Sequence, residues 1–168
     1  MIYLDLDGVF VDFNKKMIEL LGPDYKKLNV HTFWREVGKE KNLFLDLDET
    51  EDAQSLFQSI KQIAEEAKQE LSFLTAIPYS TGNLSTSRDD KIAWVRKHLS
   101  KIIPVYTVVG GINKAKYAKE GDILIDDTEK NLVAWGNVGG IAIFHQTNSS
   151  SPTILRLISV LQTQNLLK

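Results

Sequence analysis

Apolar runs and amphipathic stretches alternate along the first half of the chain. Ile2–Leu6 is a short apolar run, which is typical of a buried strand. Apolar residues recur at helical spacing over Phe13–Leu21 and again over Ala53–Leu71, so both stretches predict amphipathic helices. Ser72–Ile77 predicts the next strand, which a proline ends.

The second half continues this alternation. Residues 79–87 are rich in Ser, Thr, Gly and Asn and predict a loop, with Ser87 as the N-cap of a helix over 88–99. The elements expected next are a strand over 104–109, a short helix over 114–119, a strand over 122–125, a helix over 128–135 with Leu132, Val133 and Trp135 facing inward, a strand over 139–144, and a helix from Pro152 with the stripe Ile154, Leu155, Ile158 and Leu161. Such alternation predicts an α/β fold, with five mainly parallel strands between helices on both faces.

One stretch departs from the pattern. Residues 24–51 are irregular, with aromatic residues placed among many charges. We therefore expect a single domain with a core over 1–13 and 71–168 and a small helical insert at about 14–70. Two roles are open to the aromatic residues of the insert, which either stack on a flat ligand or form a small core of their own.

Composition and charge narrow the class of protein. The chain has 168 residues, 43% hydrophobic and 25% charged, which suits one globular domain. Its net charge of −2 gives no basic field, so we expect neither nucleic acid nor a membrane as a partner. The absence of cysteine excludes disulfides, zinc thiolates and a cysteine nucleophile. With no room for a signal peptide and no long apolar run, we expect a cytoplasmic protein.

Acidic residues follow two of the expected strands. Asp5 and Asp7 lie two positions apart at the end of the first, on the same side, and Asp126-Asp127 ends another. Carboxylates at the end of a buried strand are costly unless a metal or hydrogen bonds hold them. Ligands bind at this edge of an open α/β sheet, and oxygen ligands suit Mg²⁺. The alternative is that each pair only ends a strand in a turn, as Asp-Gly commonly does.

At this point the sequence resembles a known family. Asp5-Leu6-Asp7-Gly8-Val9 with the late Asp126-Asp127 is similar to the haloacid dehalogenase superfamily of phosphatases. Blocks in the same order, over nearly the whole chain, resemble its 5'(3')-deoxyribonucleotidase branch: Leu43–Asp48, Phe73–Pro78, Lys91–Leu99 and Leu124–Asp127. The resemblance implies a Rossmann-like three-layer sandwich with a small helical cap inserted after the first strand. It also implies Mg²⁺-dependent removal of phosphate from nucleoside monophosphates.

The resemblance also implies roles for the acidic residues. Asp5 would attack phosphorus and form an aspartyl-phosphate intermediate. Asp7 would protonate the leaving oxygen and then activate water. Asp5, the backbone carbonyl of Asp7, and one or both of Asp126 and Asp127 would hold Mg²⁺. Only one carboxylate of a consecutive pair on a regular strand faces the site, and Asp127 is the expected direct ligand.

The remaining phosphate contacts are implied in the same way. Thr75 and the amide of Ala76 would bind phosphate oxygens, although Ala76 stands where that branch more often has Ser. Lys114 would pair with the phosphate and the nucleophile, with Lys116 as a close competitor. Lys91 is a further candidate that is expected to lie one helix too early.

Three functions remain open. The first is a 5'-nucleotidase acting on (deoxy)nucleoside monophosphates, with a substrate pocket formed by Phe33, Trp34, Phe44 and Leu45 of the insert. The second is a phosphatase of another small phosphate ester or of nucleic-acid 3'-phosphate ends. The third is a catalytically idle binding protein that kept the fold, and the intact acidic motifs argue against it.

Overall fold

A parallel sheet forms the centre of the structure. The computed structural model describes residues 1–79 and 82–167, and within them five strands form one sheet in the order β3-β2-β1-β4-β5. All four pairs are parallel, as the sequence pattern predicts. The strands are β1 (Ile2–Leu4), β2 (Leu71–Ile77), β3 (Val105–Val109), β4 (Ile123–Asp126) and β5 (Ile141–Phe144).

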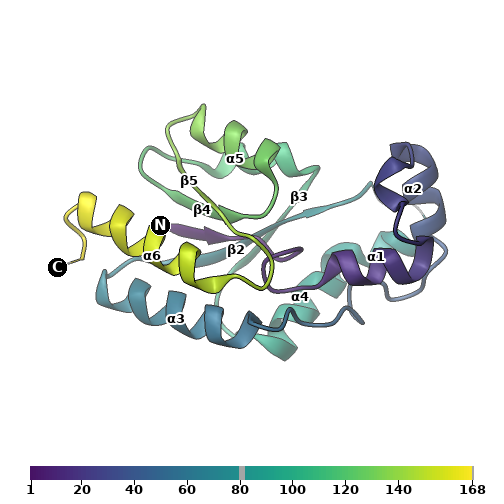
Figure 1. Cartoon of the computed structure of the whole chain (residues 1–168), viewed down its shortest axis with the longest axis horizontal. Coiled ribbons are helices and arrows are strands. Elements are labelled where there is room, and N and C mark those ends of the chain that lie inside the picture. Colours follow the sequence, from purple (N-terminus) through teal and green to yellow (C-terminus); the bar gives the residue numbers. More distant parts are fainter. Residues whose placement is uncertain (80–81, 168) are drawn as a thin grey trace.

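Helices cover both faces of the sheet (Figure 1). Three helices lie on one face, namely α3 (Ala53–Glu66), α4 (Ser87–His98) and α6 (Ser150–Thr163). The other face carries α5 (Glu129–Gly136) and a 3-10 helix over Gly111–Tyr117. Successive residues of a strand therefore enter different cores: Ile2 and Leu4 join the first, whereas Tyr3 packs edge-on against Trp135 of α5 with 5.3 Å between ring centroids. Burial on both faces explains why the central strands are apolar throughout.

A small helical unit follows β1 and lies beyond one end of the sheet (Figure 1). It contains α1 (Phe13–Leu21), a 3-10 helix over Tyr25–Lys27 and α2 (Val30–Val37). The chain leaves and re-enters the core at one place, where the Asp12 amide donates to the carbonyl of Asp48 and the Thr50 amide to that of Phe10, both at 2.9 Å. We therefore propose that the cap spans about 13–49. The last part of the expected 14–70 insert is α3, which packs beside α6.

Two helix faces differ from those expected. Val133 is 57% exposed and Leu155 is 67% exposed, so neither faces the core. The buried residues are Asn131, Leu132 and Trp135 on α5, and Thr153, Leu157, Val160 and Leu161 on α6. Apolar residues occur nearly all around α6, so spacing alone fits more than one face, and packing against β5 and α3 selects one.

The entry to α4 also differs. Ser87 is the first helical residue rather than the N-cap, which is Thr86, and the Ser87 hydroxyl donates to the carbonyl of Leu84 at 2.6 Å. The loop expected over 79–87 includes residues 80 and 81, which lie outside the described residues, and 82–86 form a short 3-10 helix.

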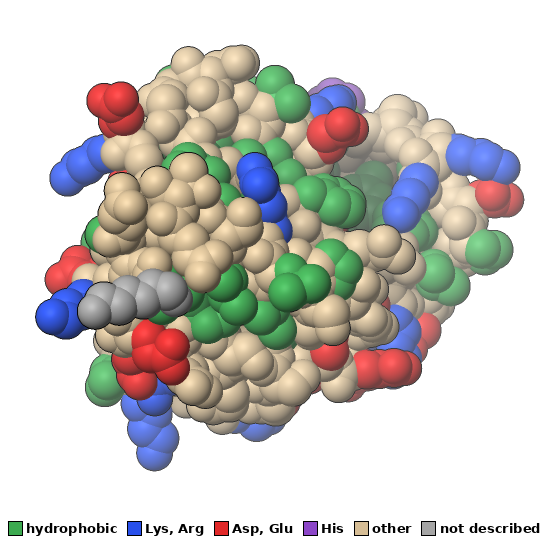
Figure 2. All heavy atoms as spheres, turned by 60° about the vertical axis from the view of Figure 1, so that its left-hand side comes forward, with side chains coloured by type: hydrophobic (Ala, Val, Ile, Leu, Met, Phe, Trp, Pro, Cys, Tyr) green, Lys and Arg blue, Asp and Glu red, His purple; other side chains and the backbone are tan. Residues whose placement is uncertain are grey.

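The surface carries mixed charge. Acidic and basic side chains are interspersed with apolar ones on the face shown in Figure 2. In the described ranges, none of the helices combines the length and the apolar character needed to cross a membrane.

Candidate active site

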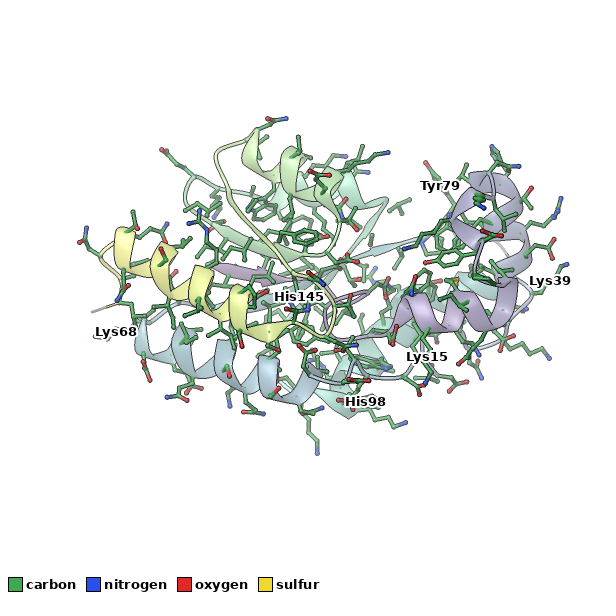
Figure 3. All side chains as sticks on the ribbon, in the orientation of Figure 1. Lys15, Lys39, Lys68, Tyr79, His98 and His145 are labelled. Atoms are coloured by element: carbon green, nitrogen blue, oxygen red, sulfur yellow. The ribbon has the colours of Figure 1, made fainter. Side chains whose placement is uncertain are left out.

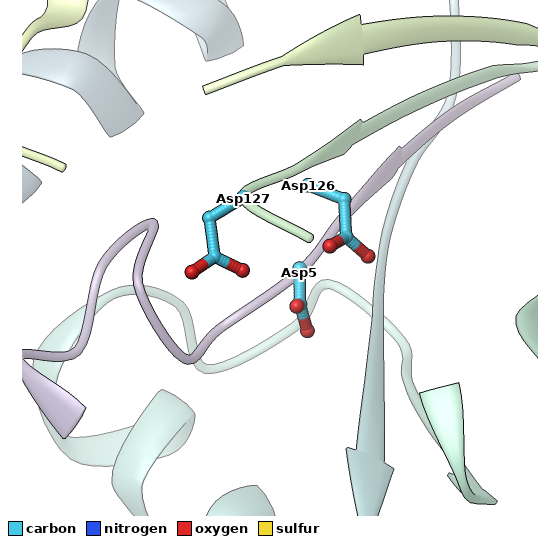
Figure 4. Close-up of side chains that lie close together, drawn as sticks. All are labelled: Asp5, Asp126 and Asp127. Carbon is cyan, nitrogen blue, oxygen red and sulfur yellow. The ribbon is translucent and has the colours of Figure 1, made fainter. Parts of the chain in front are cut away.

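Three carboxylates converge at the point in the sheet where the strand order reverses. The chain passes from β1 to β2 on one side, whereas β4 lies on the other side of β1, and ligands bind at such switch points. Asp5 follows β1 and its amide donates to the carbonyl of Ile125 at 3.0 Å, while Asp126 ends β4. Carboxylate oxygens of Asp5, Asp126 and Asp127 all lie within 4.8 Å of one another (Figure 4).

The turn after Asp7 makes room for this cluster. Gly8 has a φ of +78°, a conformation that glycine adopts without strain. A Cβ at this position would lie 2.0 Å from Oδ2 of Asp127. The Asp-Gly pair therefore does more than end a strand, because the missing side chain leaves space for a carboxylate from β4.

Lys114 joins the two acidic strand ends. Its Nζ lies 2.8 Å from Oδ2 of Asp5 and 2.6 Å from Oδ2 of Asp126, and its side chain is fully buried. Burial alone would lower the pKa of Lys114, but the two carboxylates raise it above its ordinary value. Lys116 is exposed, so the structure places Lys114, and not its competitor, beside Asp5.

Asp126 and Asp127 have different environments. Asp126 accepts hydrogen bonds from Lys114, from the Thr128 amide at 2.8 Å, and from Nδ2 of Asn131 at 3.2 and 3.1 Å. Asp127 accepts one from the Thr128 hydroxyl at 3.0 Å on Oδ1, and its carboxylate lies in the cleft. Burial, then the nearby Asp5 and Asp126, raises the pKa of Asp127 to about 7. Asn131 was not identified from the sequence, because its contact with Asp126 depends on how α5 packs against β4 and the 3-10 helix.

Lys91 lies within the site, contrary to the expectation from the sequence. Its Nζ lies 2.5 Å from Oδ2 of Asp7 and 3.0 Å from the Thr75 hydroxyl. Partial burial raises the pKa of Asp7, although the ammonium group of Lys91 opposes that increase. Lys91 shares the buried face of α4 with Trp94 and Val95, three and four residues later, so helical spacing was the signal that could have placed it inward.

The two expected phosphate contacts are placed differently. Ala76 lines the cleft, whereas Thr75 is fully buried and its hydroxyl accepts the hydrogen bond from Lys91. Thr75 thus lies behind the site and contacts it through a lysine.

A cleft of about 1520 Å³ lies between the core and the cap. Trp34 and Phe44 line it, whereas Phe33 packs against Tyr25 and Trp34, and neither Phe33 nor Leu45 is among the lining residues within the described ranges. Lining residues that the sequence did not identify include Tyr25, Val30, His31, Tyr79 and His145. Figure 3 shows Tyr79 beside α2.

Phe44 has little surface left for a ligand. Its side chain is 3% exposed, Phe13 lies parallel to its ring at a centroid distance of 6.3 Å, and the Lys91 ammonium lies 4.7 Å from the ring centroid. Trp34 is only half-buried. Of the two expected pocket residues that line the cleft, Trp34 therefore offers the more accessible ring.

The acidic cluster fits a divalent cation. Within residues 1–79 and 82–167, Oδ1 of Asp5 and Oδ1 of Asp7 are buried and have no hydrogen-bond partner. Two buried lysines pair with Asp5, Asp7 and Asp126, whereas none of the salt bridges among the described residues includes Asp127. Carboxylate oxygens grouped in this way are the ligands that Mg²⁺ prefers.

Comparison with known proteins agrees with this geometry. The profile of the family described as "5' nucleotidase, deoxy (pyrimidine), cytosolic type C protein" matches residues 26–167. That range includes Lys91, Lys114, Asp126 and Asp127, and it leaves out Asp5, Asp7 and the cap residues before 26. None of the curated proteins matches the sequence at a significant level.

Two solved structures share the fold. A haloacid dehalogenase-like hydrolase from Streptococcus pneumoniae is 14% identical with a TM-score of 0.55, and the match covers 92% of this chain and 89% of that one. A structure described as a dehalogenase is 11% identical with a TM-score of 0.56, and the match covers 91% of this chain and 87% of that one. At these identities the likeness supports the fold alone.

Proposed function

Because the chain belongs to the cytosolic type C deoxy (pyrimidine) 5'-nucleotidase family of haloacid dehalogenase phosphatases, we propose that it is a Mg²⁺-dependent phosphomonoester hydrolase. It acts on (deoxy)nucleoside monophosphates through an aspartyl-phosphate intermediate. The observation that carries the proposal is the state of Asp5. Lys114 holds one of its oxygens, and the other has no hydrogen-bond partner among the described residues, in a side chain that lines the cleft. The cytosolic type named in the family description also supports our proposal of a cytoplasmic enzyme.

Two reaction steps follow from these positions. First, Oδ1 of Asp5 bonds to phosphorus while the ester P–O bond breaks, and the carboxyl group of Asp7 gives its proton to the leaving oxygen. Second, the Asp7 carboxylate takes a proton from water as that water attacks phosphorus, and the bond between phosphorus and Asp5 breaks. Phosphate leaves, and both aspartates return to their starting states.

The aspartates of the site have different proposed roles toward the metal. Bound Mg²⁺ would neutralise charge on the phosphoryl oxygens. Asp5 and Asp127 would be its carboxylate ligands, because both line the cleft. Asp126 lies behind them, where its hydrogen bonds to Lys114 and Asn131 fix the end of β4. We therefore propose that Asp126 supports the metal site without binding the ion directly.

The metal assignment predicts unequal effects within the aspartate pair. We expect Asp127→Ala to abolish measurable Mg²⁺ binding, since it removes a direct ligand. Asp126→Ala should weaken it by about 10–100-fold, as loss of a supporting group typically does. Isothermal titration of Mg²⁺ against each purified variant, without substrate, measures both effects. Exposed Glu120, changed to alanine, serves as the control. Unaltered affinity in both aspartate variants would refute the site.

We propose that the cap recognises the rest of the substrate, because cap residues line the same cleft as the core motifs that handle the phosphoryl group. We propose that Trp34, rather than the enclosed Phe44, stacks on the nucleobase. Base–aromatic stacking is worth about 1–3 kcal/mol, roughly tenfold to a hundredfold in affinity. Trp34→Ala should raise KM for a deoxynucleoside monophosphate by that factor and leave hydrolysis of 4-nitrophenyl phosphate nearly unchanged.

Matched variants separate recognition from packing. Phe33→Leu changes the neighbouring aromatic residue, which packs against Trp34 outside the cleft. It should have little effect on the hydrolysis of either substrate. Phe44→Ala should slow the hydrolysis of both substrates and lower the melting temperature, because it removes a buried ring that packs on Phe13. Equal losses on both substrates in Trp34→Ala would show that Trp34 has no role in recognising the base.

A substrate panel tests the proposed function directly. It contains deoxyribonucleoside and ribonucleoside 5'- and 3'-monophosphates, sugar phosphates and a 3'-phosphorylated oligonucleotide, each with and without Mg²⁺. We expect the highest kcat/KM on a nucleoside monophosphate and no activity in excess chelator. A preference for sugar phosphates or for the oligonucleotide would replace the substrate assignment. Absence of all phosphatase activity would overturn the proposal.

A further inference from the structure

Lys91 is the second buried lysine of the site, and the reaction steps above give it no role. Its side chain is 2% exposed, so its ammonium group does not reach the cleft. Three groups surround that ammonium, namely Oδ2 of Asp7, the hydroxyl of Thr75, and the face of the Phe44 ring. These groups come from the turn after β1, from β2 and from the cap. Lys91 on α4 therefore contacts three separate parts of the chain.

Asp7 has little else to hold its carboxyl group. It follows β1 and precedes the Gly8 turn, outside any strand, and its side chain remains 27% exposed. Oδ1 of Asp7 has no partner among the described residues, and Oδ2 accepts its hydrogen bond from Lys91. The orientation of the Asp7 carboxyl group therefore depends on Lys91.

From these contacts we propose that Lys91 is a positioning residue that fixes the Asp7 carboxyl group toward the leaving oxygen, and that Thr75 serves the reaction by anchoring Lys91. This inference rests on the proposed function, because it assigns a role within that reaction. Misplacing a reacting group by about 1 Å costs roughly 10²-fold in rate. The loss should therefore appear in kcat and leave KM nearly unchanged, since Lys91 does not line the cleft.

Another buried residue of α4 ties the helix to the segment that returns from the cap. Trp94 follows on the same face, is almost fully buried, and donates from Nε1 to the carbonyl of Leu47 at 2.8 Å. Leu47 and Phe44 both belong to the segment that returns from the cap. Lys91 thus lies where the returning cap segment meets the core, and cap packing also bears on the position of Asp7.

The test compares leaving groups. Lys91→Met keeps most of the length of the side chain and removes the donor. We expect kcat to fall about 10²-fold on a deoxynucleoside 5'-monophosphate, whose poor leaving group needs the proton of Asp7, and less than tenfold on 4-nitrophenyl phosphate. Lys97→Met, on the exposed face of the same helix, should leave both rates unchanged. If Lys91→Met does not fold, Lys91→Gln takes its place with the same expected order of losses.

A double variant shows whether Lys91 acts through Asp7. Asp7→Asn alone should already show the unequal losses, and adding Lys91→Met should cost at most about threefold more, because coupled residues are not additive. Multiplicative losses, or equal losses on the two substrates in Lys91→Met, would overturn the inference and leave the phosphatase assignment standing. A wild-type protein without Mg²⁺-dependent phosphatase activity would overturn both.

Discussion

Asp5→Asn is expected to abolish turnover and leave the fold intact. The amide is nearly isosteric with the carboxylate, and its oxygen still accepts a hydrogen bond from Lys114 at the position of Oδ2. It cannot act as the nucleophile and is a weak ligand for Mg²⁺. Loss of a covalent nucleophile typically costs several orders of magnitude, so we expect a fall of roughly 10⁴-fold or more in kcat.

Steady-state hydrolysis of 4-nitrophenyl phosphate measures this loss, with thermal unfolding as the test of folding. The control is Asp24→Asn, which changes an exposed aspartate that pairs with Lys27 on the cap surface. It should leave turnover unchanged. A near-normal rate in Asp5→Asn would mean that phosphorus is attacked by some other group, and the aspartyl-phosphate mechanism would be wrong.

The parts of the site that lie on strands could be predicted from the sequence. Side chains alternate along a strand and parallel strands end at one edge of the sheet, so Asp5 and Asp126 meet wherever β1 and β4 are neighbours. Gly8 marks a turn by its chemistry alone. These signals are local, and the structure confirms the α/β fold and the parallel sheet of five strands that they predict.

The parts that depend on packing between elements were not predictable in this way. Lys91 is charged, and its burial follows from the way α4 packs under Thr75 and Asp7. Phe44 has the composition of a stacking residue, yet Phe13 and Lys91 cover its ring. Helical spacing could have placed Lys91 on the buried face of α4, but it does not identify the groups that Lys91 and Phe44 contact, because those partners are distant in the sequence.

The boundary of the cap illustrates the same limit. The helix over 53–66 is amphipathic, and its apolar stripe fits a cap as well as a core layer. The observed packing of α3 on α6, together with the backbone pairing at Asp12 and Asp48, supports the shorter cap that we propose.

Lys114→Met is expected to impair both stability and activity. Methionine fills nearly the same volume but removes the ammonium group from between Asp5 and Asp126, both of which are buried. Breaking a buried ion pair by removing one partner typically costs about 3–5 kcal/mol in the free energy of unfolding. For a chain of this size, that loss lowers the melting temperature by roughly 6–20 °C. Activity should fall by about 10²-fold or more, because Asp5 loses the group that orients it.

Mg²⁺ should restore part of this stability. A site that has lost a positive charge binds a dication more tightly, and a ligand that binds only the folded state stabilises it. The rise in melting temperature on adding Mg²⁺ should therefore be larger in Lys114→Met than in the wild type. Lys116→Met, two residues away and exposed, is the matched control and should behave as the wild type does. If Lys114→Met matched that control in melting temperature and turnover, the buried lysine would not be what holds Asp5 in place. A uniform loss of stability that Mg²⁺ does not offset would instead indicate that Lys114 acts in packing and not in balancing the charge of the metal site.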